Sequence, residues 1–446
     1  MVMASAAVHS LFTRGIGNWS HVATADGAAL LVDIPRDVDR VAGLLEDTRA
    51  WPVAVADTHV HNDFLSGNLL AAARYGCDIV TPAPSGVGYA ATPAFHNEPI
   101  ECGPFNVTPI HTPGHTPEHT SYLVAVDGEP RYLFSGGSIL AGALGRADLL
   151  GAWRERALGH LQLASARRLL ALPDDVVVHP THGQGSFCAV GAARTPGLTV
   201  AEARDVLQPL LETYDAEEGT RPVPAFYTSV RERNLHGVTT PVPGEVPEWG
   251  PEALLDPPGG AIPVDIRPRQ VAAAGYVPGS LLLEQGGDLG LWAGWLLAPG
   301  TSIVLVAEPS QDVAAALVTL ATAGLDRVAG YVTDVAGYAV LGGELSRYEA
   351  LDRERWLHDR ARRTDAPVVD VRWAHEVAAA PTRAVRVDLP ALYRGEAAVP
   401  SSAGEVWVGC ASGYRASLAA GILRDAGYDV HALTDGGLQD VMSESA

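Results

Sequence analysis

Short apolar runs alternate with amphipathic stretches along the first half of the chain. The apolar runs have the length and residue types of buried strands, whereas the amphipathic stretches repeat their apolar positions at helical spacing. The pattern predicts strands at Trp19–Ala23, Ala29–Asp33 and Val53–Ala56, and helices at Asp37–Asp47, Ser66–Tyr75, Ala157–Leu172 and Thr199–Tyr214. This mixture of elements indicates an α/β fold.

A segment rich in proline and glycine follows, from Arg221 to Pro263. Prolines at this density interrupt regular structure, because each one fixes φ and removes a backbone donor. The segment therefore predicts a linker or a wrapped arm.

The chain repeats itself beyond this segment. Ile262–Arg267 and Pro367–Arg372 are apolar strands that end in an Asp-x-Arg turn, and each is followed by a helix and a second buried strand, Ser302–Ala307 or Glu405–Gly409. A spacing of about 105 residues is too long for a solenoid repeat and suits two tandem domains. Alternating strands and helices predict parallel sheets that are covered on both faces.

Composition narrows the class of protein. The 446 residues include 47% hydrophobic and 19% charged residues, which is typical of a globular protein with several domains. A formal net charge of −21 argues against nucleic acid or an anionic membrane as a partner. The four cysteines show neither a disulfide framework nor a CxxC site.

Targeting signals are not evident in the sequence. Met1–Arg14 lacks the pattern of a signal peptide, and the uncharged stretch Leu289–Ala307 is broken by Pro299-Gly300. We expect a cytoplasmic protein without membrane spans. The oligomeric state stays open, a homo-oligomer included.

Three predicted strands each run into a turn that carries histidine. The candidate metal ligands in these turns are His59, His61, Asp63, His115 and His182. Imidazole and carboxylate groups suit zinc or iron better than calcium or magnesium. Any one turn alone could carry its histidines incidentally, but three such turns in one half of the chain favour a metal site.

The second repeat delivers a cysteine to the start of a helix. The strand Val406–Gly409 runs into the loop Cys410-Ala411-Ser412-Gly413-Tyr414-Arg415, and the helix Ala416–Ala426 follows. The helix dipole, the backbone amides and Arg415 place the sulfur in positive potential, which favours the thiolate. Most lone cysteines are inert and buried, but this strand–loop–helix setting favours a nucleophile that binds an anion or a persulfide sulfur.

The histidine turns resemble those of the metallo-β-lactamase fold, in particular the glyoxalase-II-like branch that includes the persulfide dioxygenases. The family's HxHxDH, TPGHT and late-histidine motifs correspond to His59/His61/Asp63, His115 and His182. The segments 134–140 and 144–149 are similar to its FTGDTL and VGRPDL motifs. The Cys410 loop resembles the active-site loop of rhodanese sulfurtransferases, in which the cysteine forms a persulfide.

These resemblances imply three domains in an α/β protein. An αββα metallo-β-lactamase sandwich would cover residues 1–240, with an arm to residue 258. A degenerate rhodanese-like domain would cover 259–350, and a rhodanese domain with catalytic Cys410 and Arg415 would cover 355–446. The first copy has Glu308 and Asp312 but no cysteine after its second strand, so we expect it to be a structural spacer that positions its sibling.

Two departures from the family bear on the metal. Phe64 replaces the last histidine of HxHxDH, which argues against a two-metal hydrolase. Gly137 stands where the persulfide dioxygenases have the aspartate that completes an iron site with the counterparts of His59 and His115. The resemblance then leaves three alternatives: weakly held Fe(II), Zn²⁺ bound by His59, His115 and His61, or no metal.

Four further residues have implied roles near this site. Asp63 and His182 are weaker candidate ligands. Arg146 and Asp148 would bind the carboxylate of a thiol substrate or form a structural ion pair.

The resemblance implies a sulfur-metabolism enzyme. One hypothesis is a bifunctional protein that processes a low-molecular-weight persulfide in its first domain and exchanges sulfur with thiosulfate, sulfite or a thiol at Cys410. The alternative is a sulfurtransferase whose first domain only binds a thiol or a partner. A weaker alternative is a zinc-dependent thioester hydrolase, which Phe64 disfavours.

Overall fold

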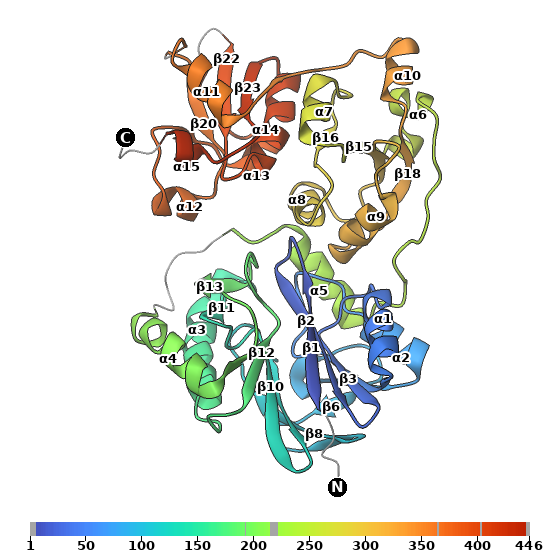
Figure 1. Cartoon of the computed structure of the whole chain (residues 1–446), viewed down its shortest axis with the longest axis vertical. Helices are drawn as coiled ribbons and strands as arrows, with labels where there is room; N and C mark the ends of the chain where they lie inside the picture. The colour runs from blue at the N-terminus through green and yellow to red at the C-terminus, as the bar shows by residue number, and fades with distance from the viewer. Residues whose placement is uncertain (1–5, 192, 215–221, 364, 402–403, 443–446) are drawn as a thin grey trace. The chain divides into compact units, whose positions relative to one another are not determined.

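A computed structural model describes residues 6–191, 193–214, 222–363, 365–401 and 404–442, and Figure 1 shows the course of the chain. The chain divides into two compact units. Unit 1 comprises Met1–Val242 and Ala321–Gly324, and unit 2 comprises Pro243–Leu320 and Leu325–Ala446. Among the helices of the described residues, none combines the length and the apolar content that a membrane span needs.

Unit 1 contains two six-stranded sheets, in the orders β1-β2-β3-β4-β5-β6 and β14-β12-β10-β9-β8-β7. The strands of the first sheet are β1 (Ala7–Thr13), β2 (Asn18–Ala25), β3 (Ala28–Val32), β4 (Trp51–Ala56), β5 (Asp78–Pro82) and β6 (Thr92–Ala94). Those of the second are β7 (Ile100–Cys102), β8 (Phe105–His111), β9 (Thr120–Val126), β10 (Glu129–Gly136), β12 (Val177–Pro180) and β14 (Leu198–Thr199). A separate ribbon pairs β11 (Ala143–Gly145) with β13 (Ala189–Gly191).

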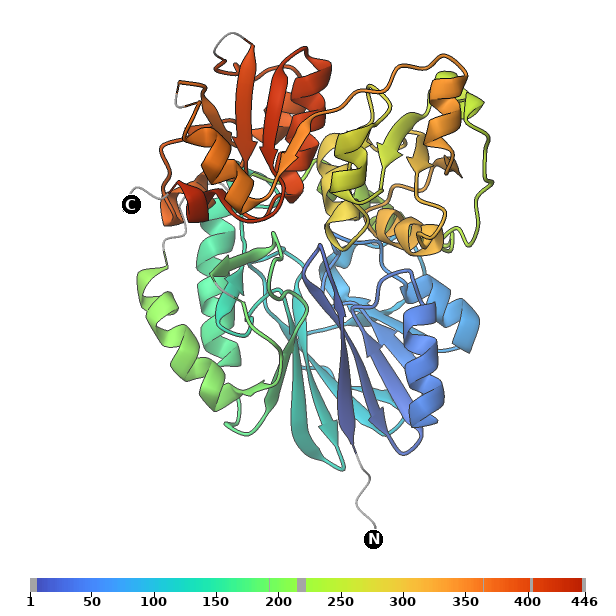
Figure 2. The same ribbon diagram turned by 45° about the horizontal axis from the view of Figure 1, so that its top comes forward.

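The two sheets of unit 1 face each other, and helices cover their outer faces (Figures 1 and 2). These helices are α1 (Asp39–Thr48), α2 (Asn68–Tyr75), α3 (Ala152–Leu169) and α4 (Val200–Thr213). Strand periodicity explains the layers: Leu30 and Val32 pack between the sheets, whereas Ala29 and Leu31 pack with α1 and α2. On the second sheet, Leu133 packs with α3 and α4. The unit is therefore an αββα sandwich, as predicted.

The proline-rich segment is more regular than predicted. Arg221 lies outside the described residues, but Phe226–His236 forms α5, and α6 (Glu252–Leu255) and the short η2 (Pro258–Gly260) follow. The prediction was wrong here because it averaged over the segment: Pro224 precedes α5 and the next proline comes after it, so the helix forms in a proline-free gap.

Unit 2 contains two parallel sheets, in the orders β16-β15-β17-β18 and β19-β23-β22-β20-β21. The first sheet consists of β15 (Ile262–Asp265), β16 (Leu281–Leu282), β17 (Ile303–Val306) and β18 (Val328–Val332), with α7 (Arg269–Ala274), α8 (Asp288–Leu296), α9 (Val313–Thr322) and α10 (Val335–Val340). The second consists of β19 (Glu349–Leu351), β20 (Val368–Asp370), β21 (Val385–Arg386), β22 (Glu405–Gly409) and β23 (Asp429–Leu433), with α11 (Arg353–Arg360), α12 (Ala374–Ala379), α13 (Leu389–Tyr393), α14 (Tyr414–Asp425) and α15 (Leu438–Val441).

The predicted repeat has the same turn in both sheets. Arg267 pairs with Asp265 at 2.6 Å after β15, and Arg372 pairs with Asp370 at 2.7 Å after β20. All four side chains are buried. The second sheet also takes in β19, so the chain enters it a few residues before the predicted domain start at 355.

Candidate metal centre and candidate nucleophile

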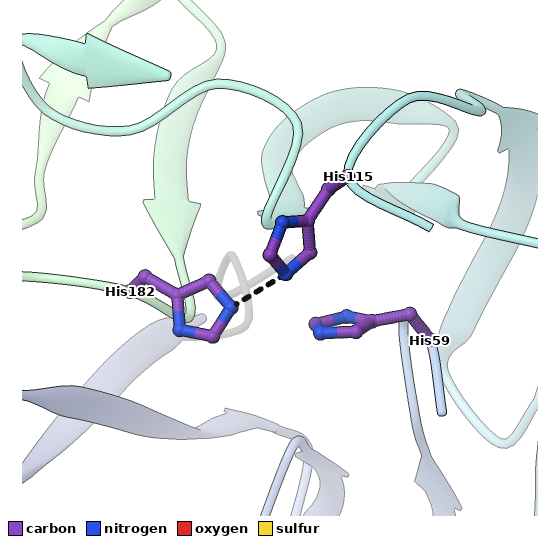
Figure 3. Close-up of side chains that lie close together, drawn as sticks. All are labelled: His59, His115 and His182. Carbon is purple, nitrogen blue, oxygen red and sulfur yellow. Dashed lines mark hydrogen bonds between the residues drawn. The ribbon is translucent and has the colours of Figure 1, made fainter. Parts of the chain in front are cut away.

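Three histidines from distant parts of unit 1 point toward one another (Figure 3). His59 follows β4, His115 lies between β8 and β9, and His182 follows β12. One ring nitrogen of each lies within 4.8 Å of those of the other two, and the Nε2 atoms of His115 and His182 are 3.2 Å apart. All three side chains are buried.

Hydrogen bonds fix the tautomers of His115 and His182. The Nδ1 atom of His115 donates to the carbonyl oxygen of Arg146 at 2.7 Å. The Nδ1 atom of His182 donates to Oδ1 of Asn18 at 3.0 Å, because the amide group of Asn18 donates to Asp63 at 2.6 Å. Both Nε2 atoms therefore carry lone pairs.

His59 is oriented in the same way. The hydroxyl of Thr58 donates to Asp33 at 2.8 Å, and so its oxygen accepts from Nδ1 of His59 at 2.9 Å. The Nε2 atom of His59 is buried and has no hydrogen-bond partner among the described residues. Three imidazole lone pairs thus border one small space, which fits a cation that takes three nitrogen ligands, such as zinc.

The protonation of these histidines agrees with a ligand role. Burial lowers the pKa of His59 and that of His115 well below 6.5, and it lowers the pKa of His182 to about 3. Neighbouring imidazoles act in the same direction. The rings are therefore neutral near pH 7, which is the form that binds metal.

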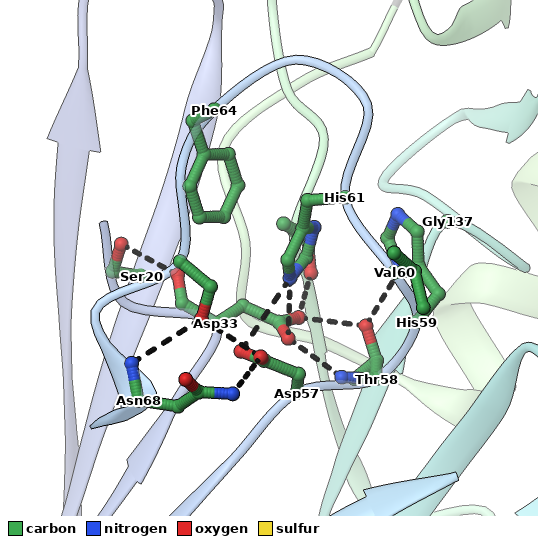
Figure 4. A network of polar contacts seen from close by, with 12 residues as sticks. Ser20, Asp33, Asp57, Thr58, His59, Val60, His61, Phe64, Asn68 and Gly137 are labelled. Atoms are coloured by element: carbon green, nitrogen blue, oxygen red, sulfur yellow. Dashed lines mark hydrogen bonds and ion pairs between the residues drawn. The ribbon is translucent and has the colours of Figure 1, made fainter. Parts of the chain in front are cut away.

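His61 points toward Asp33 and Asp57 (Figure 4), although its ring lies 4.3 Å from that of His59 between centroids. Its Nε2 atom is 3.1 Å from Asp33 and 3.7 Å from Asp57, and its ring stacks on Phe64 at a centroid distance of 4.2 Å. Burial disfavours its charged form, but the two carboxylates outweigh burial and raise the pKa of His61 to about 10. The structure thus groups a ring nitrogen of His182, rather than one of the predicted His61, with those of His59 and His115.

Asp63 acts on the cluster through Asn18. Its Oδ2 atom accepts from Asn18, lies 3.5 Å from Nδ1 of His182, and is 3.7 Å from the sulfur of Cys188. Burial raises the pKa of Cys188 well above 9, so its thiol is protonated. Cys188 also contacts the hydroxyl of Tyr227 on α5 at 3.5 Å. We therefore assign Asp63 and Cys188 to the surroundings of His182.

Gly137 packs directly against His115. A Cβ atom at position 137 would lie 2.3 Å from Cδ2 of His115. The backbone N–H of Gly137 donates to Nε2 of His119 at 2.8 Å. The position therefore has no room for a side chain while His115 keeps this rotamer. A glycine here does not leave an open place for a carboxylate ligand.

Replacing Gly137 by aspartate is expected to lower the metal content, because the new Cβ would displace His115. Metal analysis of purified variants tests this expectation, with Gly137→Ala as a control that adds the Cβ without the carboxylate. Loss of metal in both variants would agree with a clash between the new Cβ and His115. Loss of metal in the alanine variant with a gain of metal in the aspartate variant would show that the carboxylate binds metal.

Sequence reasoning missed Gln162 of α3. Its Oε1 atom accepts from the backbone N–H of His115 at 2.9 Å, and its Nε2 atom donates to the carbonyl oxygens of Gly137 and Ser138. Gln162 therefore ties the two loops on either side of the cluster together. An isolated glutamine on a predicted helix gives no signal of such a role.

Arg146 and Asp148 form the structural ion pair that was the alternative prediction. Two nitrogens of Arg146 contact Asp148 at 2.8 and 2.6 Å, and a third donates to the carbonyl oxygens of Phe187 and Pro222. Arg146 is buried. Its contribution to the cluster is its backbone carbonyl, which orients His115.

A small cavity of about 10 Å³, with room for about one water molecule, adjoins the cluster on the side of His59. Its lining combines polar and apolar groups: Asp57, His59, Val60, His61, Thr81, Pro82, Ser85, Val87, Tyr89 and Asn234.

The buried neutral histidines predict acid lability. Burial lowers the pKa of His21 to about 4 and that of His179 to about 3. The unfolded chain would take up protons below about pH 6.5 that the folded chain does not, so each such group reduces stability as pH falls, by about 1.4 kcal/mol per pH unit. Urea unfolding at pH 7 and about pH 5 should show this loss, and His179→Phe should reduce its slope. A slope that the variant leaves unchanged would contradict the assignment.

The Cys410 loop joins β22 to α14. The backbone N–H of Gly413 donates to the sulfur of Cys410 at 3.1 Å, and Cys410 is 0% exposed. Gly413 has φ 89°, and a Cβ there would lie 2.2 Å from the carbonyl oxygen of Thr434. Only glycine fits this turn without strain, and the turn brings the backbone N–H of Gly413 onto the sulfur.

Arg415, predicted as a fixed positive charge beside the sulfur, is held by an ion pair. Its guanidinium makes two bonds to the carboxylate of Glu376 on α12, at 2.5 and 2.7 Å. It also lies 5.8 Å from the ring of Trp292 on α8. Burial alone would raise the pKa of Glu376, but the hydrogen bonds and the charge of Arg415, together with the backbone N–H of Trp373, outweigh burial and lower this pKa, so the pair is ionised.

The first copy in unit 2 contacts this loop directly. Arg269 donates to the carbonyl oxygens of Ser412 and Thr434, both at 3.2 Å, and pairs with Glu284 at 2.6 Å. The hydroxyl of Tyr414 donates to the carbonyl oxygen of Glu284 at 3.1 Å. The first copy therefore contacts the residues on both sides of Gly413, as a spacer that positions its sibling would.

No protein-family model and no curated protein matches this sequence. Among solved structures, a metallo-β-lactamase from Staphylococcus aureus is similar over 73% of this chain and 98% of its own, at 22% identity and a TM-score of 0.64. ETHE1 from Myxococcus xanthus matches 51% of this chain and 98% of its own, at 21% identity and a TM-score of 0.41. The first match covers more of the chain than unit 1 holds, and so extends into unit 2. The three-histidine cluster thus lies in a unit that has the metallo-β-lactamase fold.

Proposed function

We propose that this protein is a sulfur-handling enzyme that transfers sulfane sulfur through Cys410. The observation that carries the proposal is a cysteine held between a buried strand and the start of α14, with a backbone N–H on its sulfur. The six-residue loop resembles that of the rhodanese sulfurtransferases. In this proposal, residues 355–446 are the active rhodanese domain and 259–350 are its degenerate copy.

The loop residues have distinct tasks in this reaction. Cys410 attacks the outer sulfur of a donor and keeps it as a persulfide, which a thiol or sulfite then removes. The N–H of Gly413 and the positive end of α14 stabilise negative charge on the bound sulfur. Arg415, fixed by Glu376, positions the start of the helix.

For unit 1 we infer a metal centre held by His59, His115 and His182. Three neutral imidazoles without a carboxylate match zinc better than Fe(II), which in such sites takes two histidines and a carboxylate. Zinc would supply a Lewis acid beside the cavity.

The three-histidine set also favours a second candidate function for unit 1, a zinc-dependent hydrolase. The alternatives remain a persulfide-dioxygenase-like activity and a scaffold that only binds thiol. Metal analysis of full-length protein purified without added metal, followed by oxygen uptake on a persulfide and hydrolysis of a thioester, separates them. Zinc with hydrolysis supports the hydrolase, iron with oxygen uptake supports the dioxygenase, and neither activity supports the scaffold.

Sulfur transfer is tested by incubating the full-length protein with thiosulfate or with a small persulfide. The proposal predicts a mass gain of one sulfur atom on Cys410 and thiocyanate formation when cyanide is added. Absence of both with every donor would overturn the proposed function.

A further inference from the structure

The positive charges that contact the Cys410 loop are already paired. Both nitrogens at the end of Arg415 bind Glu376, and Arg269 binds Glu284. Among the described residues, these are the two arginines that contact the loop or lie in it. The carboxylates of Glu376 and Glu284 therefore neutralise the charges of Arg415 and Arg269, and these two pairs add no net charge to the loop.

This pairing bears on the charge of the sulfur donor. Thiosulfate carries two negative charges on the group that must approach Cys410, which is fully buried. Burying a dianion requires unmatched positive charge. The backbone amide of Gly413 and the N-terminus of α14 supply only part of one charge.

An apolar wall borders the same ion pair. Trp292, which lies under Arg415, stacks on Trp373 at a centroid distance of 5.6 Å, and Trp373 also packs against Trp295 at 4.8 Å. The backbone N–H of Trp373 donates to Glu376 at 2.7 Å. The carbon chain of an alkyl persulfide packs well on aromatic rings, whereas the charged SO₃ group of thiosulfate does not.

We propose that Cys410 takes its sulfur from the alkyl persulfide of a small thiol and discriminates against thiosulfate. This inference rests on the proposed sulfur transfer and names its donor class. The Cys410 sulfur attacks the outer sulfur of R–S–SH, the S–S bond of the donor breaks, and the thiol R–SH leaves with the proton. A persulfide on Cys410 forms, and no oxidant or reductant is consumed.

The experiment measures the rate at which Cys410 gains a sulfur atom in the full-length protein, by intact mass. The two donors are thiosulfate and the persulfide of 2-mercaptoethanol, whose carrier is uncharged. Each rate is divided by the rate of the same donor with free cysteine, which removes intrinsic reactivity. We expect the normalised rate to favour the persulfide by at least about tenfold.

Two variants test the electrostatic cause. Glu284→Gln frees the charge of Arg269, and Glu376→Gln frees that of Arg415, so both should speed loading from thiosulfate several-fold and narrow the preference. Glu354→Gln is the matched control, because Glu354 is an exposed glutamate of α11. It should leave the preference unchanged.

The outcomes distinguish the preference for a persulfide donor from the sulfur transfer through Cys410 on which it rests. Equal loading from both donors, or faster loading from thiosulfate, would overturn the donor preference and leave sulfur transfer standing. A preference that neither Glu284→Gln nor Glu376→Gln narrows would overturn the charge argument. Loading from neither donor would overturn the proposed function and the inference with it.

Discussion

Replacing Cys410 by serine is expected to reduce sulfur transfer by on the order of 10³-fold or more, because the hydroxyl cannot hold the transferred sulfur as a persulfide. Cys410 is the cysteine that β22 delivers to a helix N-terminus, and its sulfur already accepts a backbone hydrogen bond. Thiocyanate formation from a persulfide donor and cyanide measures the loss. Folding is checked by comparing the unfolding transitions of the variant and the wild type.

Cys102→Ser is the matched control for this prediction. Burial raises the pKa of Cys102 to about 11, so its thiol is protonated near neutral pH and is a poor nucleophile. The control should keep full activity. Comparable activity in Cys410→Ser, or a sulfur atom found on Cys102 or Cys188, would place the nucleophile elsewhere.

Replacing His182 by glutamine is expected to lower bound metal by at least about tenfold, since one of three ligands is lost. His61→Gln is the informative comparison, because the sequence alone favoured His61 as the third ligand. In the structure, His61 is a charged partner of two buried carboxylates. Its loss should leave metal content nearly intact and reduce the free energy of unfolding by about 3–5 kcal/mol.

Metal analysis and urea unfolding of both variants decide between the two ligand sets. Loss of metal in His61→Gln with retention in His182→Gln would restore the sequence-based set. Wild-type protein without metal under any loading condition would contradict both sets.

The sequence predicted the layers of unit 1 and the repeat in unit 2 because both follow from local periodicity. Leu30 and Val32 alternate with Ala29 and Leu31, and that alternation alone separates the two faces of β3. The orientation of the His61 side chain could not be predicted from local periodicity. It depends on Asp33, which is distant in sequence and reaches the turn only because β3 and β4 are neighbours.

The ion pairs that neutralise the arginines at the Cys410 loop also could not be predicted from the sequence. Arg415 belongs to the loop itself, but Glu376 and Arg269 come from other elements. Nothing in their local patterns marks them as partners. Contacts between elements far apart in sequence decide these details, whereas strand and helix identity is decided within each element.

The helix α5 sets a minimum length for a working unit 1. All three clustered histidines precede residue 183, yet Asn234 of α5 donates to the carbonyl oxygens of His61 and Phe64 at 2.9 and 2.8 Å. Arg231 binds Glu118 and the carbonyl oxygen of Val60. A fragment cut after α4 would look complete by its motifs but would lack the helix that holds the turn carrying the first histidine. A fragment that keeps these contacts therefore has to include α5, which ends at His236.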